Sequence, residues 1–319
     1  MLPSSKIPYT AAPLSIQEQI ISLQQKGLLI QDEEMAVQWL SHISYFRFRN
    51  YSITFKAGDG KYIPDTTFEM IRDTYLFDRK LKMILFEALE NIEISVKTQL
   101  SNIMSLAHGP HWYTDSSHFI SEAERKTIIR DTIVGTDIPK LFNHSDFLST
   151  IEKELEAPEE FFLKHYKKTY EPLHPPSWMM MEMITFGTLS LMFENLKPSP
   201  EKTQIFEAFN LTKKHMISWL HCFSFIRNKC AHHSRLVYSR ITIAPSLPLK
   251  RSRQFLAEAD LVQNDSLYAV LSCVQFLLGI CNNSSTFKEN IVKLTKEFPS
   301  VDYTKLGFTP DWRNESLWS

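Results

Sequence analysis

Glycine is scarce in this chain, with only 8 glycines among 319 residues against 16 prolines. Such a composition disfavours Gly-rich phosphate-binding loops, and it disfavours all-β folds whose tight turns need glycine. No run of about 18 apolar residues occurs, so we expect neither a transmembrane helix nor a membrane partner. The N-terminus lacks a basic segment followed by an apolar one, so we expect no signal peptide and a cytoplasmic protein.

Cysteine pairs with metal-site spacing are also lacking. The four cysteines are Cys222, Cys230, Cys273 and Cys281. Without a CxxC pair, the sequence excludes a zinc ribbon or a thioredoxin-type motif, and four thiols are too few for a secreted disulfide scaffold. We expect buried, reduced thiols. The adjacent pair His232 and His233 would point apart on a helix, so we expect no metal site and no cofactor.

The remaining composition is that of a globular protein, because 43% of the residues are hydrophobic and 12% are aromatic. Helical periodicity dominates, and it is strongest after a capping-box signature at Thr66 and Glu69. The apolar stripe of that helix keeps a spacing of three or four: Leu81, Leu85, Ala88, Ile92, Val96 and Leu100. We expect this helix to end near His108, before Gly109, and to be kinked or broken once because of its length.

Further helices are predicted along the chain, and no alternating β pattern persists. Their expected extents are 15–26, a helix after Asp32, 121–133, 145–157, 159–168, Ser177 to Leu196, Thr212 to at least Ile226, and Asp265 to Cys281. Pro198 and Pro200 are expected to end the Ser177 helix. The aromatic segment 44–55 fits either a helix end or an extended stretch. We predict an all-α bundle over 66–285, an N-terminal helical extension over 1–65, and short helices with a tail over 286–319.

Acidic residues are missing from one long window, Ala208 to Ala257, although the whole chain carries 36 of them. The same window holds nine lysines and arginines, which makes it a candidate surface for a polyanion in a chain of net charge −1. A solvated basic face without a ligand is the alternative. The cationic residues expected to contact RNA are Lys213, Lys214, Lys229, His233, Arg235 and Arg240.

The window contains Arg227, Asn228 and His232, and these residue types suit phosphodiester cleavage in RNA. A histidine can move the 2′-hydroxyl proton, a guanidinium can neutralise charge on the phosphate, and an asparagine can orient either group. On a regular helix Arg227 and His232 lie about 140° apart, with Asn228 and Ala231 between them. One histidine cannot easily serve as both base and acid, so a two-fold dimer with two copies is attractive. Alternatively, Arg227 caps a helix and His232 packs.

Several sequence blocks resemble the Abi-like abortive-infection proteins of bacteria, of the AbiD and AbiF type, from about residue 15 to 245. The blocks are Ser44–Arg47, Phe77–Leu81, Ala88–Glu93, Gly109–Tyr113, Pro175–Trp178, Phe186–Ser190 and Arg227–Leu236. One departure follows the last block, where Val237 stands at the position in which the family pattern has tryptophan.

The resemblance implies a fold of the HEPN type, a superfamily of helical bundles whose signature is Arg, four to six residues, then His. Carried onto this chain, the signature falls on Arg227, Asn228 and His232. It implies a metal-independent endoribonuclease of phage defence that acts as a homodimer. A small noncoding RNA is a further partner implied by the resemblance. A non-catalytic module that holds such an RNA, or another partner, stays open as the alternative function.

Overall fold

The computed structural model of the protein describes residues 12–121, 123–124, 142–171, 173–248, 255–257 and 259–319. Over these residues the chain is helical, and the β structure is confined to three isolated bridges. The all-α prediction is therefore confirmed. No helix in the described ranges has the length and apolarity required to span a bilayer. The chain divides into an N-terminal unit, up to Lys80 with Leu294–Asp302, and a larger unit, Leu81–Lys293 with Tyr303–Ser319.

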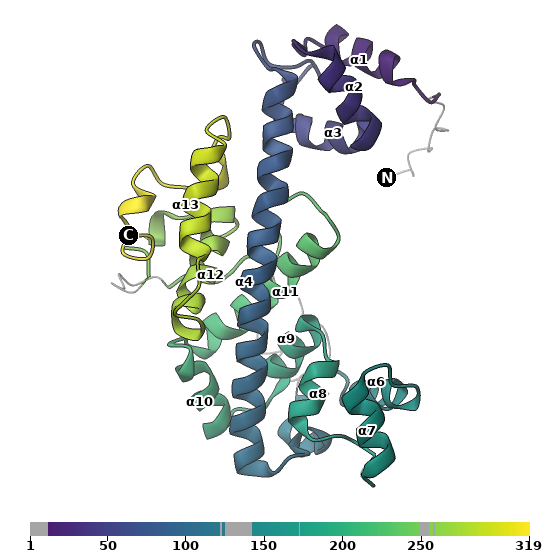
Figure 1. Ribbon diagram of the computed structural model, residues 1–319. Coiled ribbons are helices and arrows are strands. Elements are labelled where there is room, and N and C mark those ends of the chain that lie inside the picture. The colour runs from purple at the N-terminus through teal and green to yellow at the C-terminus, as the bar shows by residue number, and fades with distance from the viewer. Residues whose placement is uncertain (1–11, 122, 125–141, 172, 249–254, 258) are drawn as a thin grey trace, which may run out of the picture. The chain divides into compact units, whose positions relative to one another are not determined.

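The N-terminal unit begins with three short helices: α1 (Ile16–Gln25), α2 (Glu33–His42) and α3 (Tyr45–Ser52) (Figure 1). Each follows a side-chain cap, because Ser15, Asp32 and Ser44 accept hydrogen bonds from backbone amides of the first turn. The helices expected at 15–26 and after Asp32 are confirmed. The undecided segment 44–55 is helix α3 followed by the 3-10 turn η1 (Ile53–Phe55).

The long helix α4 (Phe68–His108) is capped one residue later than expected. The Thr67 hydroxyl accepts from the Met70 amide at 3.3 Å, whereas the Thr66 hydroxyl donates to the Ile63 carbonyl at 2.7 Å. The predicted capping box at Thr66 is therefore wrong, because the preceding turn already uses that hydroxyl. Helix α4 ends before Gly109, as expected, and Gly109 adopts a positive φ of 85°.

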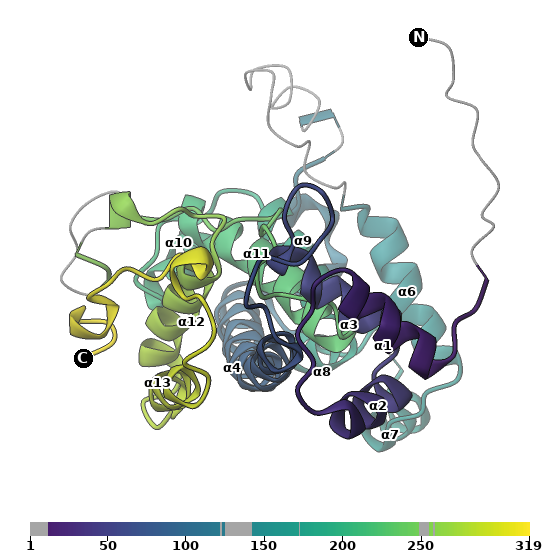
Figure 2. The ribbon, with the colours of Figure 1, turned by 90° about the horizontal axis from the view of Figure 1, so that it is seen from above.

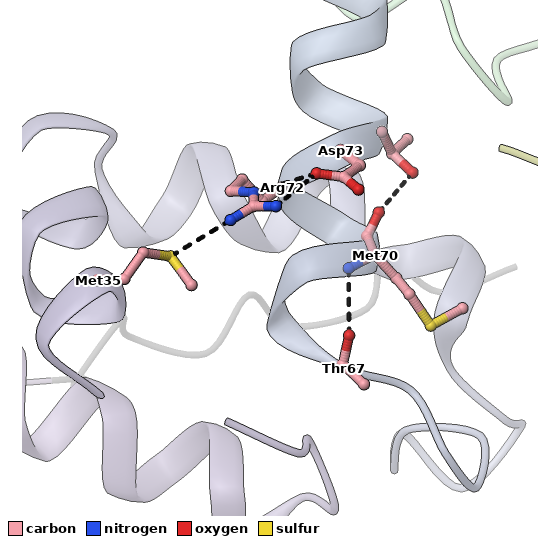
Figure 3. Close-up of polar contacts among 6 residues, drawn as sticks. Met35, Thr67, Met70, Arg72 and Asp73 are labelled. Carbon is pink, nitrogen blue, oxygen red and sulfur yellow. Dashed lines mark hydrogen bonds and ion pairs between the residues drawn. The ribbon is translucent and has the colours of Figure 1, made fainter. Parts of the chain in front are cut away.

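An arginine near the start of α4 joins this helix to α2 (Figure 3). The Arg72 guanidinium donates to the Asp73 carboxylate at 2.9 and 3.1 Å, and its Nη1 lies 3.9 Å from the Met35 sulfur. Deeper in the same unit, the Tyr51 hydroxyl donates to the fully buried Asp78 carboxylate at 2.6 Å. Two segments distant in sequence are thereby fixed together.

Helix α4 is one unbroken helix of 41 residues, so the break that was considered for it does not occur. Its length follows from its packing, since the predicted apolar stripe from Leu81 to Leu100 is buried within the larger unit. Burial of one continuous stripe stabilises a helix well beyond the length that an isolated segment would maintain. Figure 2, viewed along α4, shows α8, α11 and α12 around it.

The other helices of the described ranges follow the sequence in order. They are α6 (His144–Glu156), α7 (Phe161–Thr169), α8 (Ser177–Met183), α9 (Phe186–Asn195), α10 (Pro200–Ala208), α11 (Lys213–Ala231), α12 (Leu267–Cys281) and α13 (Phe287–Glu297). The helices expected at 145–157 and 159–168 are confirmed as α6 and α7. Most of the helix expected at 121–133 lies outside the described residues.

Three predicted boundaries differ from the structure. The helix expected from Ser177 to Leu196 is two helices, because Ile184 is extended and Thr185 caps α9 by accepting from Thr188. Pro200 begins α10 instead of ending its predecessor, as proline at the first helical position can. Ser266, and not Asp265, caps α12. The cysteines are free, as expected, and three of them are buried while Cys281 is half-buried.

Candidate ribonuclease site

Helix α11 carries the candidate catalytic residues near its C-terminal end. Thr212 caps its start by accepting from the His215 amide at 3.3 Å, as the sequence predicts. Its apolar side is buried against α9, where Gly187 lies close enough that an added Cβ would be 3.4 Å from the Ser224 hydroxyl. Close packing on this side leaves the opposite side of the helix, with Asn228 and Ala231, exposed.

The end of α11 is closed by a Schellman turn. The His233 amide donates to the Cys230 carbonyl at 3.2 Å, and the Ser234 amide donates to the Lys229 carbonyl at 2.9 Å. His233 takes the left-handed backbone position of this turn, with φ of 53°, where glycine is usual. The helix is thus regular through Ala231, and it does not break near Lys229.

Arg227 is held by an aromatic ring of α4. Its guanidinium carbon lies 5.5 Å from the centre of the Phe86 ring, in a cation–π contact, and its Nη1 donates to the Asn228 side-chain oxygen at 3.4 Å. Among the described residues Arg227 forms no ion pair. A half-buried guanidinium that keeps most of its donors can bind a phosphate in bidentate fashion.

His232 is exposed at the end of the helix, one turn beyond Asn228. Its backbone amide donates to the Asn228 carbonyl at 2.9 Å, so the two residues are fixed relative to each other. The alternative in which Arg227 caps a helix end and His232 packs does not fit, because the guanidinium lies on Phe86 and the imidazole faces solvent. The side chains of Arg227, Asn228 and His232 thus belong to one exposed end of α11.

Three of the predicted RNA contacts lie close to this end of α11, and the structure gives each a different setting. The Lys229 ammonium lies 5.5 Å from the Phe225 ring and donates to Ser239 at 3.4 Å. The carbonyl of Arg235 accepts from the same Ser239 hydroxyl at 3.2 Å, and the side chain of Arg235 is half-buried. His233 occupies the capping turn, and its side chain is exposed.

The other predicted RNA contacts are either paired with a carboxylate or distant from the candidate catalytic residues. Arg240 is 83% exposed but pairs with Asp265 at 2.8 Å, so a phosphate would compete with a carboxylate. Lys213 and Lys214 begin α11, and the rise of an α-helix separates them from His232 by about 27 Å. The structure therefore does not bring these two lysines to the candidate catalytic residues.

Two residues of α4 that support the site escaped the sequence analysis. Phe86 carries the Arg227 guanidinium, and the buried Lys82 donates to the Ser234 carbonyl at 3.4 Å, just past the capping turn. Phe86 lies outside the buried apolar stripe of α4, and an aromatic residue at such a position was the available signal. Its contact with a residue 141 positions later could not be predicted from the sequence.

Apolar side chains also remain exposed beside Phe86 on α4. Met83 is 70% exposed, Phe86 36% and Ile94 56%, and their spacing places them along one side of the helix. We call these three residues the α4 stripe. The exposed Glu87 and Glu90 lie on the same side of the helix, so the stripe is a mixed apolar and acidic surface.

The described residues contain no group of three or more metal-ligating side chains arranged to hold an ion. Neither curated proteins nor solved structures give a match to this chain. The family model of the Abi-like proteins matches residues 38–238, a span that includes α3, the whole of α4 and the end of α11. This match covers well over half of the sequence, and it ends just beyond the capping turn that carries His233. The chain therefore belongs to the Abi-like protein family.

Proposed function

We propose that this protein is a metal-independent endoribonuclease of bacterial phage defence, acting in the cytoplasm on RNA. The family supplies the link to abortive infection. The observation that carries the ribonuclease assignment is the exposed end of α11, where Arg227 has no carboxylate partner in the described chain and His232 faces solvent. These residues can act together on a phosphodiester without a bound ion.

The proposed reaction is transesterification. The 2′-oxygen attacks the neighbouring phosphorus while a His232 imidazole accepts the hydroxyl proton. A bond forms between the 2′-oxygen and phosphorus, the bond to the 5′-oxygen breaks, and a protonated imidazole supplies the proton of the leaving 5′-hydroxyl. Arg227 stabilises the charge that grows on the non-bridging oxygens, and Asn228 holds the guanidinium. The products are a 2′,3′-cyclic phosphate and a 5′-hydroxyl end.

Two protomers supply the two imidazoles in this proposal. Base and acid must lie on opposite sides of the phosphorus, and one ring cannot occupy both positions at once. We place the two-fold interface on the α4 stripe, where Met83, Phe86 and Ile94 alternate with the exposed Glu87 and Glu90, because this side of the helix is adjacent to Arg227. A symmetric pair joined there would bring both ends of α11 toward one axis.

The test is cleavage of single-stranded RNA in the presence of EDTA, followed by analysis of the ends. We expect cyclic phosphate and 5′-hydroxyl ends. Dilution of the wild-type chain with an equal amount of His232→Ala protein, after subunit exchange, tests the shared site. Compared with the same total amount of wild-type chain alone, random pairing leaves about a quarter of the activity if both imidazoles are needed, and independent subunits would leave about half. An activity of half would refute the composite site, and uncut RNA would refute the nuclease.

The alternative is a module that holds an RNA and cuts nothing. The same exposed basic end of α11 favours it, because phosphate binding needs only the guanidinium and ammonium groups. An RNA that copurifies with intact ends, together with no cleavage by the wild-type chain, would favour this function. Salt dependence of binding would not separate the two functions, since both use phosphate contacts.

A further inference from the structure

One face of α3 in the N-terminal unit is exposed although it is rich in apolar and cationic side chains. Phe46, Arg49 and Ile53 recur at intervals of three and four residues and therefore share one side of the helix and its 3-10 extension. Phe46 is 82% exposed and Ile53 is 58% exposed. The opposite side, with Phe48 and Tyr51, is buried in the core of the unit. A phenylalanine this exposed contributes little to folding, and its ring is open to a ligand.

Cations beside this face are held on tyrosine rings. The Arg49 guanidinium lies 5.7 Å from the Tyr45 ring, and the Lys56 ammonium lies 5.0 Å from the Tyr62 ring. Lys56 and Tyr62 pair across a small antiparallel bridge, and the Tyr62 amide donates to the Lys26 carbonyl at 2.8 Å. The backbone thus brings Lys26 to the same place. We call Phe46, Arg49 and Ile53, with Lys26 and Lys56, the α3 surface.

Within the described ranges, Lys26, Arg49 and Lys56 form no ion pair with a carboxylate. The sequence has no Asp or Glu from Met35 to Gly58, and the next acid, Asp59, accepts the Lys61 amide at 2.9 Å within its own turn. The pKa of Lys56 is lowered, first by burial and then by the charges of Arg49 and Lys26. An anion that binds between these cations would lower their mutual repulsion, which favours binding of a polyanion.

We propose that the α3 surface binds single-stranded RNA, with a base stacked on Phe46 and phosphates on Arg49, Lys56 and Lys26. Exposed aromatic rings beside cations are the usual means of holding unpaired strands without reading their sequence. The face is a short helical ridge with a few cations, which suits a flexible strand better than the rigid grooves of a duplex. The proposal rests on the proposed function only for the choice of RNA over DNA.

Binding of a 2′-O-methyl oligoribonucleotide to the full chain tests the proposal, because this probe cannot be cut through its 2′-oxygen. We compare the wild type with Phe46→Ala and with the double variant Arg49→Ala/Lys56→Ala. Loss of one base stack should weaken binding about tenfold. Loss of two phosphate contacts should lower the slope of log K against log salt by about 1.4. Both variants change exposed or half-buried side chains, and circular dichroism verifies their folding.

The matched control is Lys164→Ala/Lys168→Ala, which removes the same charge from exposed positions of α7. Affinities of the α3 variants that equal the control would overturn the proposal. So would a Phe46→Ala protein that binds the probe normally but loses a protein partner or a vesicle of anionic lipids. Failure of the wild type to cut unmodified RNA would refute the nuclease alone, because the probe reports binding without cleavage.

Discussion

Two cations of the larger unit, Lys202 and Arg227, lie beside aromatic rings but have opposite surroundings. The Lys202 ammonium is buried and donates to the carbonyls of Glu194 at 3.1 Å and Leu196 at 2.6 Å, at the end of α9. Arg227 is half-buried on Phe86 and meets one neutral side-chain oxygen. Lys202 completes a helix end that would otherwise hold orphaned carbonyls, whereas Arg227 keeps its donors for a ligand. The difference separates an amine that serves the fold from a guanidinium that is available to a ligand.

The largest effect is expected for substitutions at the candidate site, which should lower activity and leave the fold intact. Arg227→Ala and His232→Ala should each lower RNA cleavage at least about a hundredfold, because each removes a group that acts in the transition state. The exposed His232→Ala change should lower the free energy of unfolding by no more than about 0.5 kcal/mol, and Arg227→Ala by about 1 kcal/mol because it also removes the contact with Phe86. Cleavage rates and urea denaturation measure the two quantities. If both variants cut RNA like the wild type, the assignment of Arg227 and His232 as catalytic residues is refuted.

The reverse pattern is expected for Lys202→Met. At pH 9, where the lowered pKa leaves the amine uncharged, the substitution keeps the apolar stem beside Phe193 but leaves two buried carbonyls without a donor, which should cost about 2 kcal/mol of stability. Cleavage under folding conditions should be unchanged. Urea denaturation measures the stability of the variant, and the cleavage assay measures its activity. A normal unfolding midpoint in this variant would show that water or another donor replaces the ammonium.

The pH dependence of stability sharpens the same contrast. Burial, with a smaller contribution from the charge of Lys213, lowers the pKa of Lys202 to about 7, whereas an unfolded lysine titrates near 10.5. Between these values the unfolded chain binds the extra proton, so the free energy of unfolding rises as the pH is raised from about 7 toward 10. Lys202→Met should remove this rise. Chemical denaturation of both proteins at pH 7, 8 and 9 measures the difference, and parallel curves would contradict the shift.

The smallest effect concerns the turn that ends α11. His233→Gly should stabilise the protein by up to about 1 kcal/mol, because glycine adopts the observed φ of 53° without the strain of a side chain. Thermal denaturation measures this change, with His232→Gly as the matched control at an ordinary backbone position. If His233→Gly is less stable than the wild type, the imidazole makes a contact that outweighs the strain.

Local signals in the sequence predicted much of the fold. Thr212 and the apolar periodicity after it gave α11, and the stripe from Leu81 to Leu100 gave the buried side of α4. The predicted helix start was wrong where two similar residues compete for the capping position, as Thr66 and Thr67 do. Only the preceding turn, in which Thr66 donates to Ile63, decides which hydroxyl is free to cap. The division between α8 and α9 at Ile184 was not predicted, because the run of methionines before it fits one continuous helix equally well.

The candidate site was predictable in its chemistry but not in its support. Arg227 and His232 stand out by residue type and spacing within an acid-free window. Phe86 and Lys82 act on the site from a helix far away in sequence, and only folding brings them there. The same limit explains Arg240, whose pairing with Asp265 neutralises a charge that the window counts as available.

As the proposed dimer interface, the α4 stripe would make activity depend steeply on the amount of chain in the cell. When the total concentration of chain is below the dissociation constant of the proposed dimer, the concentration of dimer is proportional to the square of that total. Halving the amount of chain then lowers the amount of dimer about fourfold. A cell could then carry a small quantity of this chain harmlessly, and a rise in its synthesis or lifetime during infection would suffice to turn it on.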